Sequence, residues 1–88
     1  MTFDTTTTIT WASAGDQHNT ALSTARDIEI STMISDGKTD GSQLEVTPTT
    51  TTRYWLDSAS AQEYGTFISN AAIAYNCTIT SIVYGTRS

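Results

Sequence analysis

Two threonine tracts occupy equivalent positions in the two halves of this chain. Thr5–Thr8 is followed by Trp11, and Thr49–Thr52 is followed by Trp55, at an offset of half the chain's 88 residues. Threonine is β-branched and favours strands. Apolar residues interrupt both tracts at strand spacing, which argues against a disordered low-complexity segment. The repeat therefore predicts β-strands at corresponding places in two similar halves.

The first tract lies in a predicted strand over residues 3–12. Phe3, Ile9 and Trp11 alternate with polar residues at a period of two, so we expect these three side chains to face inward. Thr6, Thr8 and Thr10 then point to the opposite face.

A helical pattern follows this strand. Asp16 is a suitable N-cap, and the spacing predicts a helix from Gln17 to about Ser35 that ends at Asp36-Gly37, where glycine provides a left-handed C-cap. The predicted apolar stripe comprises Leu22, Ala25, Ile28, Thr32 and Met33. Ile30 and Ile34 lie off this stripe, and the pattern leaves open whether they widen the buried face or form an exposed pair.

The second half contains two strands before its helix. Residues 43–47 predict a short strand ended by Pro48, which favours a sheet edge or a turn. Residues 49–57 predict the next strand, with Tyr54 and Leu56 on one face.

The second helix and a final strand complete the pattern. Several residues from Asp57 to Ser60 are suitable N-caps, and Ser60 with Glu63 matches a capping box. The helix runs to about Tyr75, and Asn76 is a plausible left-handed terminator. Its expected apolar face comprises Tyr64, Phe67, Ile68, Ala71, Ala72 and Tyr75. The last strand is expected over residues 77–84, which are rich in isoleucine and valine.

The predicted order is β-α-β-β-α-β over a single α+β domain, residues 1–88. Two similar βαβ halves favour a two-layer ferredoxin-like sandwich, with a four-stranded antiparallel sheet and two helices on one face. The first and third strands would then lie at the centre. In the alternative, residues 43–57 form one long strand in a three-stranded sheet.

Charge and hydropathy exclude several classes of protein. Nine acidic and four basic residues give a net charge of −5, the wrong sign for gripping nucleic acid through its phosphates. No apolar stretch approaches the roughly 20 residues of a membrane helix. The start of the chain lacks a basic region followed by an apolar core, so we expect a soluble protein without an export signal.

No chemistry-bearing motif is complete. Gly37-Lys38-Thr39 lacks the earlier glycine of a P-loop, and Asp36–Gly41 lacks the glutamate that closes a calcium loop. Cys77 is the only cysteine and lies in a β-branched run, which is typical of a small buried hydrophobe. His18 has no acid three or four residues later, and a surface or capping role is expected. We therefore expect no catalytic residue, no metal site and no cofactor.

The open sheet face is the predicted interaction site. Thr6, Thr8 and Thr10 suit a solvated face or a moderately polar interface. One face of the third strand carries Arg53 and Trp55 together, and tryptophan beside arginine on an open sheet is enriched at interface hot spots. In the alternative, Trp55 lies at the sheet margin under a neighbouring loop.

The chain as a whole resembles small uncharacterised proteins of tailed bacteriophages. The resemblance rests on the Thr-rich opening strand, the Asp36-Gly37-Lys38-Thr39-Asp40-Gly41 loop, and Thr52-Arg53-Tyr54-Trp55-Leu56-Asp57 leading into Ser58–Tyr64. It implies a viral origin, with a place in the host cytoplasm or the virion, and no inherited catalytic residues.

Two functional hypotheses follow. The first is a non-enzymatic interaction or structural protein that forms homo-oligomers or docks to a viral partner, without contacting nucleic acid or membrane. The second is a small-ligand-binding protein or small enzyme with an apolar cavity between sheet and helices of a ferredoxin-like dimer. In that second case His18 would be the base, and the cavity would be lined by Trp11, Tyr54, Tyr64 and Tyr75.

Overall fold

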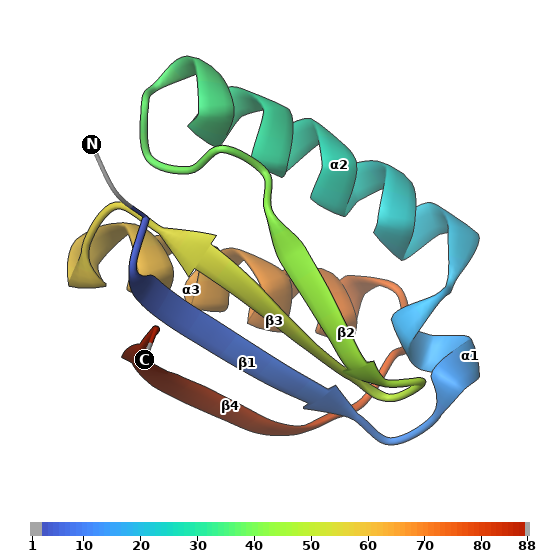
Figure 1. The fold of residues 1–88 in the computed structure, drawn as a ribbon. Helices are drawn as coiled ribbons and strands as arrows, with labels where there is room; N and C mark the ends of the chain where they lie inside the picture. Colours follow the sequence, from blue (N-terminus) through green and yellow to red (C-terminus); the bar gives the residue numbers. More distant parts are fainter. Residues whose placement is uncertain (1–2, 88) are drawn as a thin grey trace.

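The four predicted strands form one antiparallel sheet in the computed structural model, which describes residues 3–87 (Figure 1). The strand order is β2-β3-β1-β4, and every neighbouring pair is antiparallel. The strands are β1 (Thr5–Trp11), β2 (Gln43–Thr47), β3 (Thr50–Trp55) and β4 (Ile79–Thr86). The helices are α1 (Ala14–Gln17), α2 (Thr20–Ser35) and α3 (Ser58–Ala74). The alternative with one long strand over 43–57 is therefore wrong, because Pro48 and Thr49 form a turn between β2 and β3.

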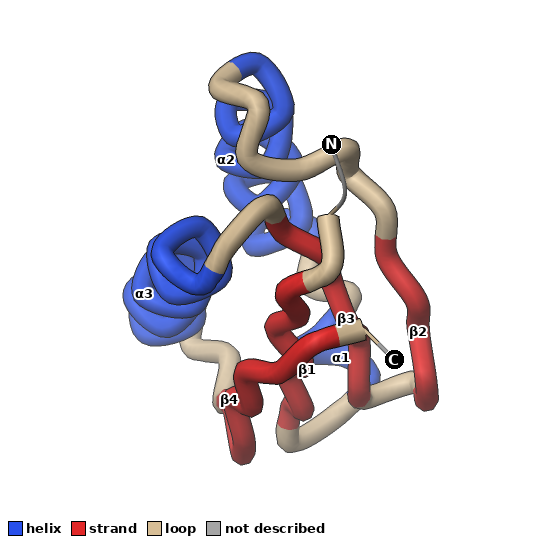
Figure 2. Tube along the Cα trace, turned by 60° about the vertical axis from the view of Figure 1, so that its left-hand side comes forward, coloured by secondary structure: helices blue, strands red, loops and turns tan. Residues whose placement is uncertain are grey.

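Both long helices lie on one face of this sheet (Figure 2). β1 and β3 are central, as the repeat predicts, and β2 and β4 are the edges. Thr7, Ile9 and Trp11 are buried beneath the helices. The alternate residues of β1 face the other side of the sheet, which no helix covers. This is the predicted ferredoxin-like arrangement.

The first helical segment is divided, which corrects the prediction of one helix from Gln17. Ser13 caps α1 by accepting a hydrogen bond from the Asp16 amide (3.1 Å), and Asn19 caps α2 by accepting one from the Leu22 amide (3.0 Å). Asp16 is not the N-cap; its carboxylate instead accepts a hydrogen bond from the Thr78 amide (3.1 Å). Two successive capping side chains each favour a new start, so the chain turns between the two helices.

The buried stripe of α2 differs from the predicted one. Leu22, Ile30 and Met33 are buried, whereas Ile28 and Ile34 are exposed. Ile30 therefore belongs to the core, and Ile28 faces solvent. The helix ends as predicted, because Gly37 adopts a φ of 75° and the Lys38 amide donates to the Met33 carbonyl (2.9 Å).

α3 begins at a different capping residue from the predicted capping box. The Asp57 side chain accepts a hydrogen bond from the Ser60 amide (2.8 Å), so Ser60 is already inside the helix. The predicted end is confirmed, since Asn76 has a φ of 57°. The Cys77 amide then donates to the Ala72 carbonyl (2.8 Å), so Cys77 is part of the helix terminus. β4 therefore begins at Ile79 and not at residue 77 as predicted.

The core lies between α3 and the central strands. Trp55 and Tyr64 pack with ring centroids 4.7 Å apart, and the buried Thr7 hydroxyl donates to the Ala61 carbonyl (3.1 Å). Cys77 is buried, which confirms the prediction for the lone cysteine. The remaining core residues are Ile9, Trp11, Leu22, Ile30, Met33, Ala61, Ile68, Ala71 and Ala72.

The loop that resembles nucleotide and calcium motifs has a structural role. The buried Thr39 hydroxyl donates to the Tyr54 carbonyl (2.7 Å) and accepts from the Gly41 amide (3.1 Å). The Leu56 amide donates to the Lys38 carbonyl (2.8 Å). These bonds fasten the segment after α2 to the end of β3. No helix among residues 3–87 is long and apolar enough to cross a bilayer.

Candidate functional site: an open sheet face and an arginine-lined cavity

The predicted interface residues divide between the two faces of the sheet. Thr6, Thr8 and Thr10 lie on the open face, partly exposed. Trp55 is only 1% exposed and packs in the core beneath α3. The expectation that Trp55 lies on the open face, and its alternative at the sheet margin, are both wrong.

Arg53 lies on the helix side together with Trp55. The register pairs Thr7 with Arg53 and Thr5 with Trp55, so both β3 residues share the buried side of β1. The sequence pattern predicted that Arg53 and Trp55 share a face, and the structure confirms this. The pattern did not show that this face is the one covered by the helices. The helix-side position of Arg53 becomes evident only once the strand register is known.

The centre of the open face is a double row of threonines. The hydroxyls of Thr8 and Thr52 are hydrogen-bonded to each other at 2.9 Å, and those of Thr10 and Thr50 at 3.1 Å. Because each pair is satisfied within the sheet, burial of these hydroxyls against another molecule carries a smaller desolvation cost than burial of free ones.

Apolar side chains lie on the outer strands of the same face. The register places Leu44 of β2 opposite Thr52 and Val83 of β4 opposite Thr8. Leu44 is 54% exposed and Val83 is 55% exposed. Sequence reasoning missed both, although their alternation with Glu45 and Ile82 would have marked them once the inward residues were known.

Within the four strands, the open face carries no charged side chain. The two charged residues within the strands, Glu45 and Arg53, both point to the helix side. At one end of the face the Arg87 guanidinium lies 3.7 Å from the centre of the Tyr54 ring. This stacking covers the tyrosine and leaves the threonine rows and the apolar edges accessible.

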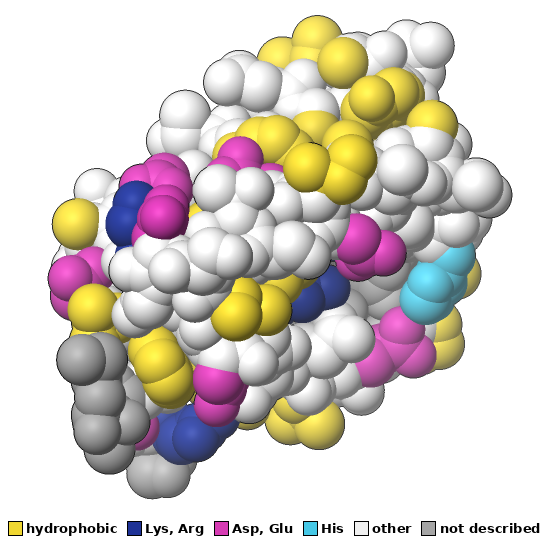
Figure 3. Space-filling view, turned by 90° about the horizontal axis from the view of Figure 1, so that it is seen from above, with side chains coloured by type: hydrophobic (Ala, Val, Ile, Leu, Met, Phe, Trp, Pro, Cys, Tyr) yellow, Lys and Arg dark blue, Asp and Glu magenta, His cyan; other side chains and the backbone are white. Residues whose placement is uncertain are grey.

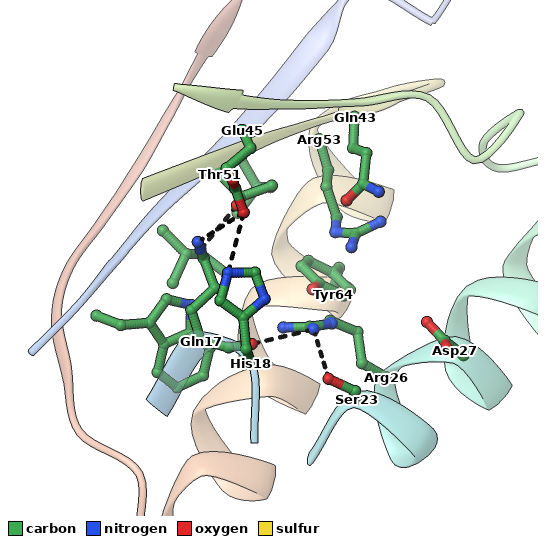
Figure 4. Close-up of a pocket in the computed structure, with 13 residues that line it drawn as sticks. Gln17, His18, Ser23, Arg26, Asp27, Gln43, Glu45, Thr51, Arg53 and Tyr64 are labelled. Atoms are coloured by element: carbon green, nitrogen blue, oxygen red, sulfur yellow. Dashed lines mark hydrogen bonds and ion pairs between the residues drawn. The ribbon is translucent and has the colours of Figure 1, made fainter. Parts of the chain in front are cut away.

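A cavity of about 400 Å³ lies on the opposite side of the sheet, between α2 and the strands β1, β2 and β3 (Figure 4). It forms because the buried residues of α2 belong to the core shared with α3, while a more polar side of α2 faces the sheet. The lining residues are Thr7, Ile9, Trp11, Gln17, His18, Ser23, Arg26, Asp27, Gln43, Glu45, Thr51, Arg53 and Tyr64.

One rim of the cavity is formed by Gln17, the last residue of α1, and by His18, which follows it. Gln17 donates to the Pro48 carbonyl (2.8 Å) and accepts from the Thr51 hydroxyl (2.7 Å). Glu45 lies 3.1 Å from His18 Nε2 and accepts from Gln17 at 3.3 Å. In Figure 3 the histidine lies beside acidic side chains, with basic atoms recessed nearby. These contacts fix the position of the rim carboxylate.

Two arginines enter the cavity from opposite walls (Figure 4). Arg26 projects from α2, and its Nη2 donates to the Gln17 carbonyl (3.2 Å) and the Ser23 hydroxyl (3.0 Å). Its Nε is buried and has no acceptor among the described residues. Arg53 projects from β3, with its guanidinium carbon 5.9 Å from the centre of the Tyr64 ring.

The electrostatics of this cavity follow from burial. Burial lowers the pKa of Arg53 from its usual value, and the positive charge of Arg26 lowers it further, whereas Tyr64 and Asp27 oppose the shift. Burial also raises the pKa of Tyr64, so its hydroxyl stays protonated. The two guanidinium groups are therefore partly shielded from water, in a cavity that Asp27 and Glu45 also line.

Some of the residues named for the cavity of the second hypothesis line this one. Trp11 and Tyr64 line the cavity as expected, and His18 lies at its exposed rim as the C-cap of α1. Tyr54 lies on the open face under Arg87, and Tyr75 is exposed at the end of α3. The lining is also more polar than predicted, because Arg26, Arg53 and Glu45 contribute to it.

Residues 3–87 contain no group of three or more His, Cys, Asp or Glu side chains arranged to hold a metal ion. No protein-family model, curated protein or solved structure matches this chain.

Proposed function

We propose that the protein is a small non-enzymatic interaction protein that self-associates through the open face of its sheet. The observation that carries this proposal is that neither charged residue of the four strands points to this face, in a chain with a net charge of −5. Two acidic copies repel each other least where they meet through an uncharged surface. Interface centres are likewise depleted in charged residues.

The distribution of side chains on the face suits a two-fold contact. The threonine rows of β1 and β3 are central, and Leu44 and Val83 lie on the two outer strands. A two-fold axis lying between the facing sheets places threonines against threonines and apolar edges against apolar edges. The face is roughly 20 Å on each side, so the contact would be at the small end of specific interfaces and would depend on concentration.

The test is solution mass by light scattering across a concentration series. We expect a monomer at low concentration and a dimer at high concentration. The double variant Leu44→Lys with Val83→Lys should lower the dimer fraction at least tenfold, because it places lysines on both apolar edges. The matched control is Ile28→Lys with Ile73→Lys, which changes the charge equally at exposed helix positions.

Three results would oppose the proposal. These are a monomer at every concentration, a dimer that survives the edge substitutions, or equal losses in the edge and control variants. Circular dichroism of each variant confirms that the fold is retained.

We also propose a viral origin, on the sequence resemblance to phage proteins described above. In that setting the self-associating face serves a virion or accessory component, in the host cytoplasm or in the particle. Detection of the protein by mass spectrometry in purified phage particles would support the virion role. A gene placed outside any phage or prophage region would argue against the origin.

A further inference from the structure

Among residues 3–87, three of the four Lys and Arg side chains have no ion pair, and two of these three line the cavity. Lys38 is paired with Glu63 at 2.9 Å, and Arg87 stacks on the open face. Arg26 and Arg53 both line the cavity, and no carboxylate oxygen of residues 3–87 lies within 4.0 Å of either guanidinium. In a chain with nine acidic residues, this placement leaves both guanidinium groups of the cavity wall without a direct carboxylate partner.

Uncompensated guanidinium groups in a shielded site favour an anion from outside. Removing a charge from water is costly unless a partner offsets the loss. Burial is the main cause of the lowered pKa of Arg53, and the positive charge of Arg26 on the opposite wall adds to it. An anion placed between them removes both penalties, and each guanidinium presents a planar fork of donors for a two-oxygen acceptor.

We propose that this cavity binds a small organic carboxylate, held between Arg26 and Arg53. Rim carboxylates limit the charge that the site accepts: Asp27 and Glu45 also line the cavity, so they repel a single negative charge less than a dianion. This favours a carboxylate over a phosphate dianion.

The rest of the cavity fits the body of such a ligand. Ile9, Trp11 and Tyr64 supply apolar surface, and the Thr51 and Ser23 hydroxyls are nearby polar groups. A volume of about 400 Å³ lies in the range of small-molecule sites. The cavity is on the helix side of the sheet, so this proposal is independent of self-association through the open face.

The test is a titration of the ¹⁵N-labelled full chain with benzoate, monitored by NMR, with benzamide as the neutral probe of the same shape. Benzoate should give saturable shifts at the backbone amides of Arg26, Thr51 and Arg53, and benzamide should not. Arg53→Gln should weaken benzoate binding at least tenfold, about one lost charge-assisted interaction. The matched control, Arg87→Gln, removes the same charge on the open face and should leave binding unchanged.

Other outcomes would overturn the proposal. Equal shifts with benzoate and benzamide would indicate apolar binding without anion recognition. Absence of saturable shifts at these amides, or stronger binding of inorganic phosphate, would exclude the carboxylate assignment. Equal weakening by Arg53→Gln and Arg87→Gln would reflect net charge alone. Should Arg53→Gln fail to fold, Arg26→Gln on α2 makes the same test, and the benzoate–benzamide comparison requires no variant.

Discussion

Thr8 and Thr52 are equivalent residues of the two threonine tracts, and their hydroxyls are hydrogen-bonded to each other at the centre of the sheet. They are separated by 44 residues in sequence and by 2.9 Å between hydroxyl oxygens. The register extends outward symmetrically, with Thr10 paired to Thr50 and Thr6 to Tyr54. The internal repeat of the sequence thus coincides with a local two-fold relationship between β1 and β3.

This pairing predicts non-additive effects of substitution. Thr8→Val or Thr52→Val alone leaves one hydroxyl without its partner, whereas the double variant replaces both with an apolar pair. We expect each single variant to lose about 0.5–1 kcal/mol of unfolding free energy and the double variant to lose less than their sum. Urea denaturation of the four proteins measures the coupling. Additive losses would mean that water replaces the missing partner without cost.

The buried position of Trp55 predicts a large loss of stability on truncation. Trp55→Ala should lower the free energy of unfolding by about 3–5 kcal/mol, because it opens a cavity against Tyr64. Tyr75→Ala, at an exposed aromatic residue, should cost no more than about 1 kcal/mol. Thermal and urea denaturation compare them. Similar losses in both variants would contradict the assignment of Trp55 to the core.

Gly65 and Tyr84 should be energetically coupled. A Cβ atom at position 65 would overlap the Tyr84 hydroxyl, which packs over α3 from β4. Gly65→Ala gains about 1 kcal/mol of helix propensity but must displace that ring. In a Tyr84→Ala background the gain should be realised, so Gly65→Ala stabilises there and not in the wild type. Equal effects in both backgrounds, measured by urea denaturation, would show that the ring moves freely.

The cap of α3 predicts a pH-dependent contribution to stability. Hydrogen bonds from Ser60, and more weakly the charge of Lys38, lower the pKa of Asp57 below its usual 3.8. Because the folded-state pKa is the lower one, this stabilisation is present above pH 3.8 and is lost as pH falls through the folded value.

Asp57→Asn keeps a hydrogen-bond acceptor but cannot titrate. Its unfolding free energy should fall less steeply between about pH 5 and about pH 2 than that of the wild type. Asp57→Ala should be destabilised already at neutral pH, since it lacks the cap. Identical acid slopes for wild type and Asp57→Asn would assign the pH dependence to other carboxylates.

The fold was largely predictable because several signals agreed. The repeat gave two similar halves, Pro48 marked the turn before β3, and handedness of crossovers then limits the order of strands. Asn76 and Gly37 ended their helices as expected, since both adopt the left-handed conformation that these positions need. These features depend on local conformation, which neighbouring residues in sequence determine.

The site was less predictable because it depends on contacts between distant segments. β3 carries large side chains on both faces, so the pattern alone does not show which face is buried. The charge of Arg53 suggested a solvent-exposed face, whereas Trp55 on the same face is buried in the structure. The cavity exists because Leu22, Ile30 and Met33 direct α2 into the core shared with α3. No sequence pattern relates Arg26 to Arg53 before that packing is known.

Both outer strands carry a break in their pairing, at Thr80 in β4 and at Val46 in β2. A regular edge strand that is rich in threonine and valine and carries little charge can pair with the same strand of another molecule, and repeated pairing builds cross-β fibrils. An extra residue in each edge strand increases the local twist and interrupts the row of free amides and carbonyls. We therefore expect these two irregularities to disfavour fibril formation, so that deleting either residue shortens its lag time in a dye-binding assay.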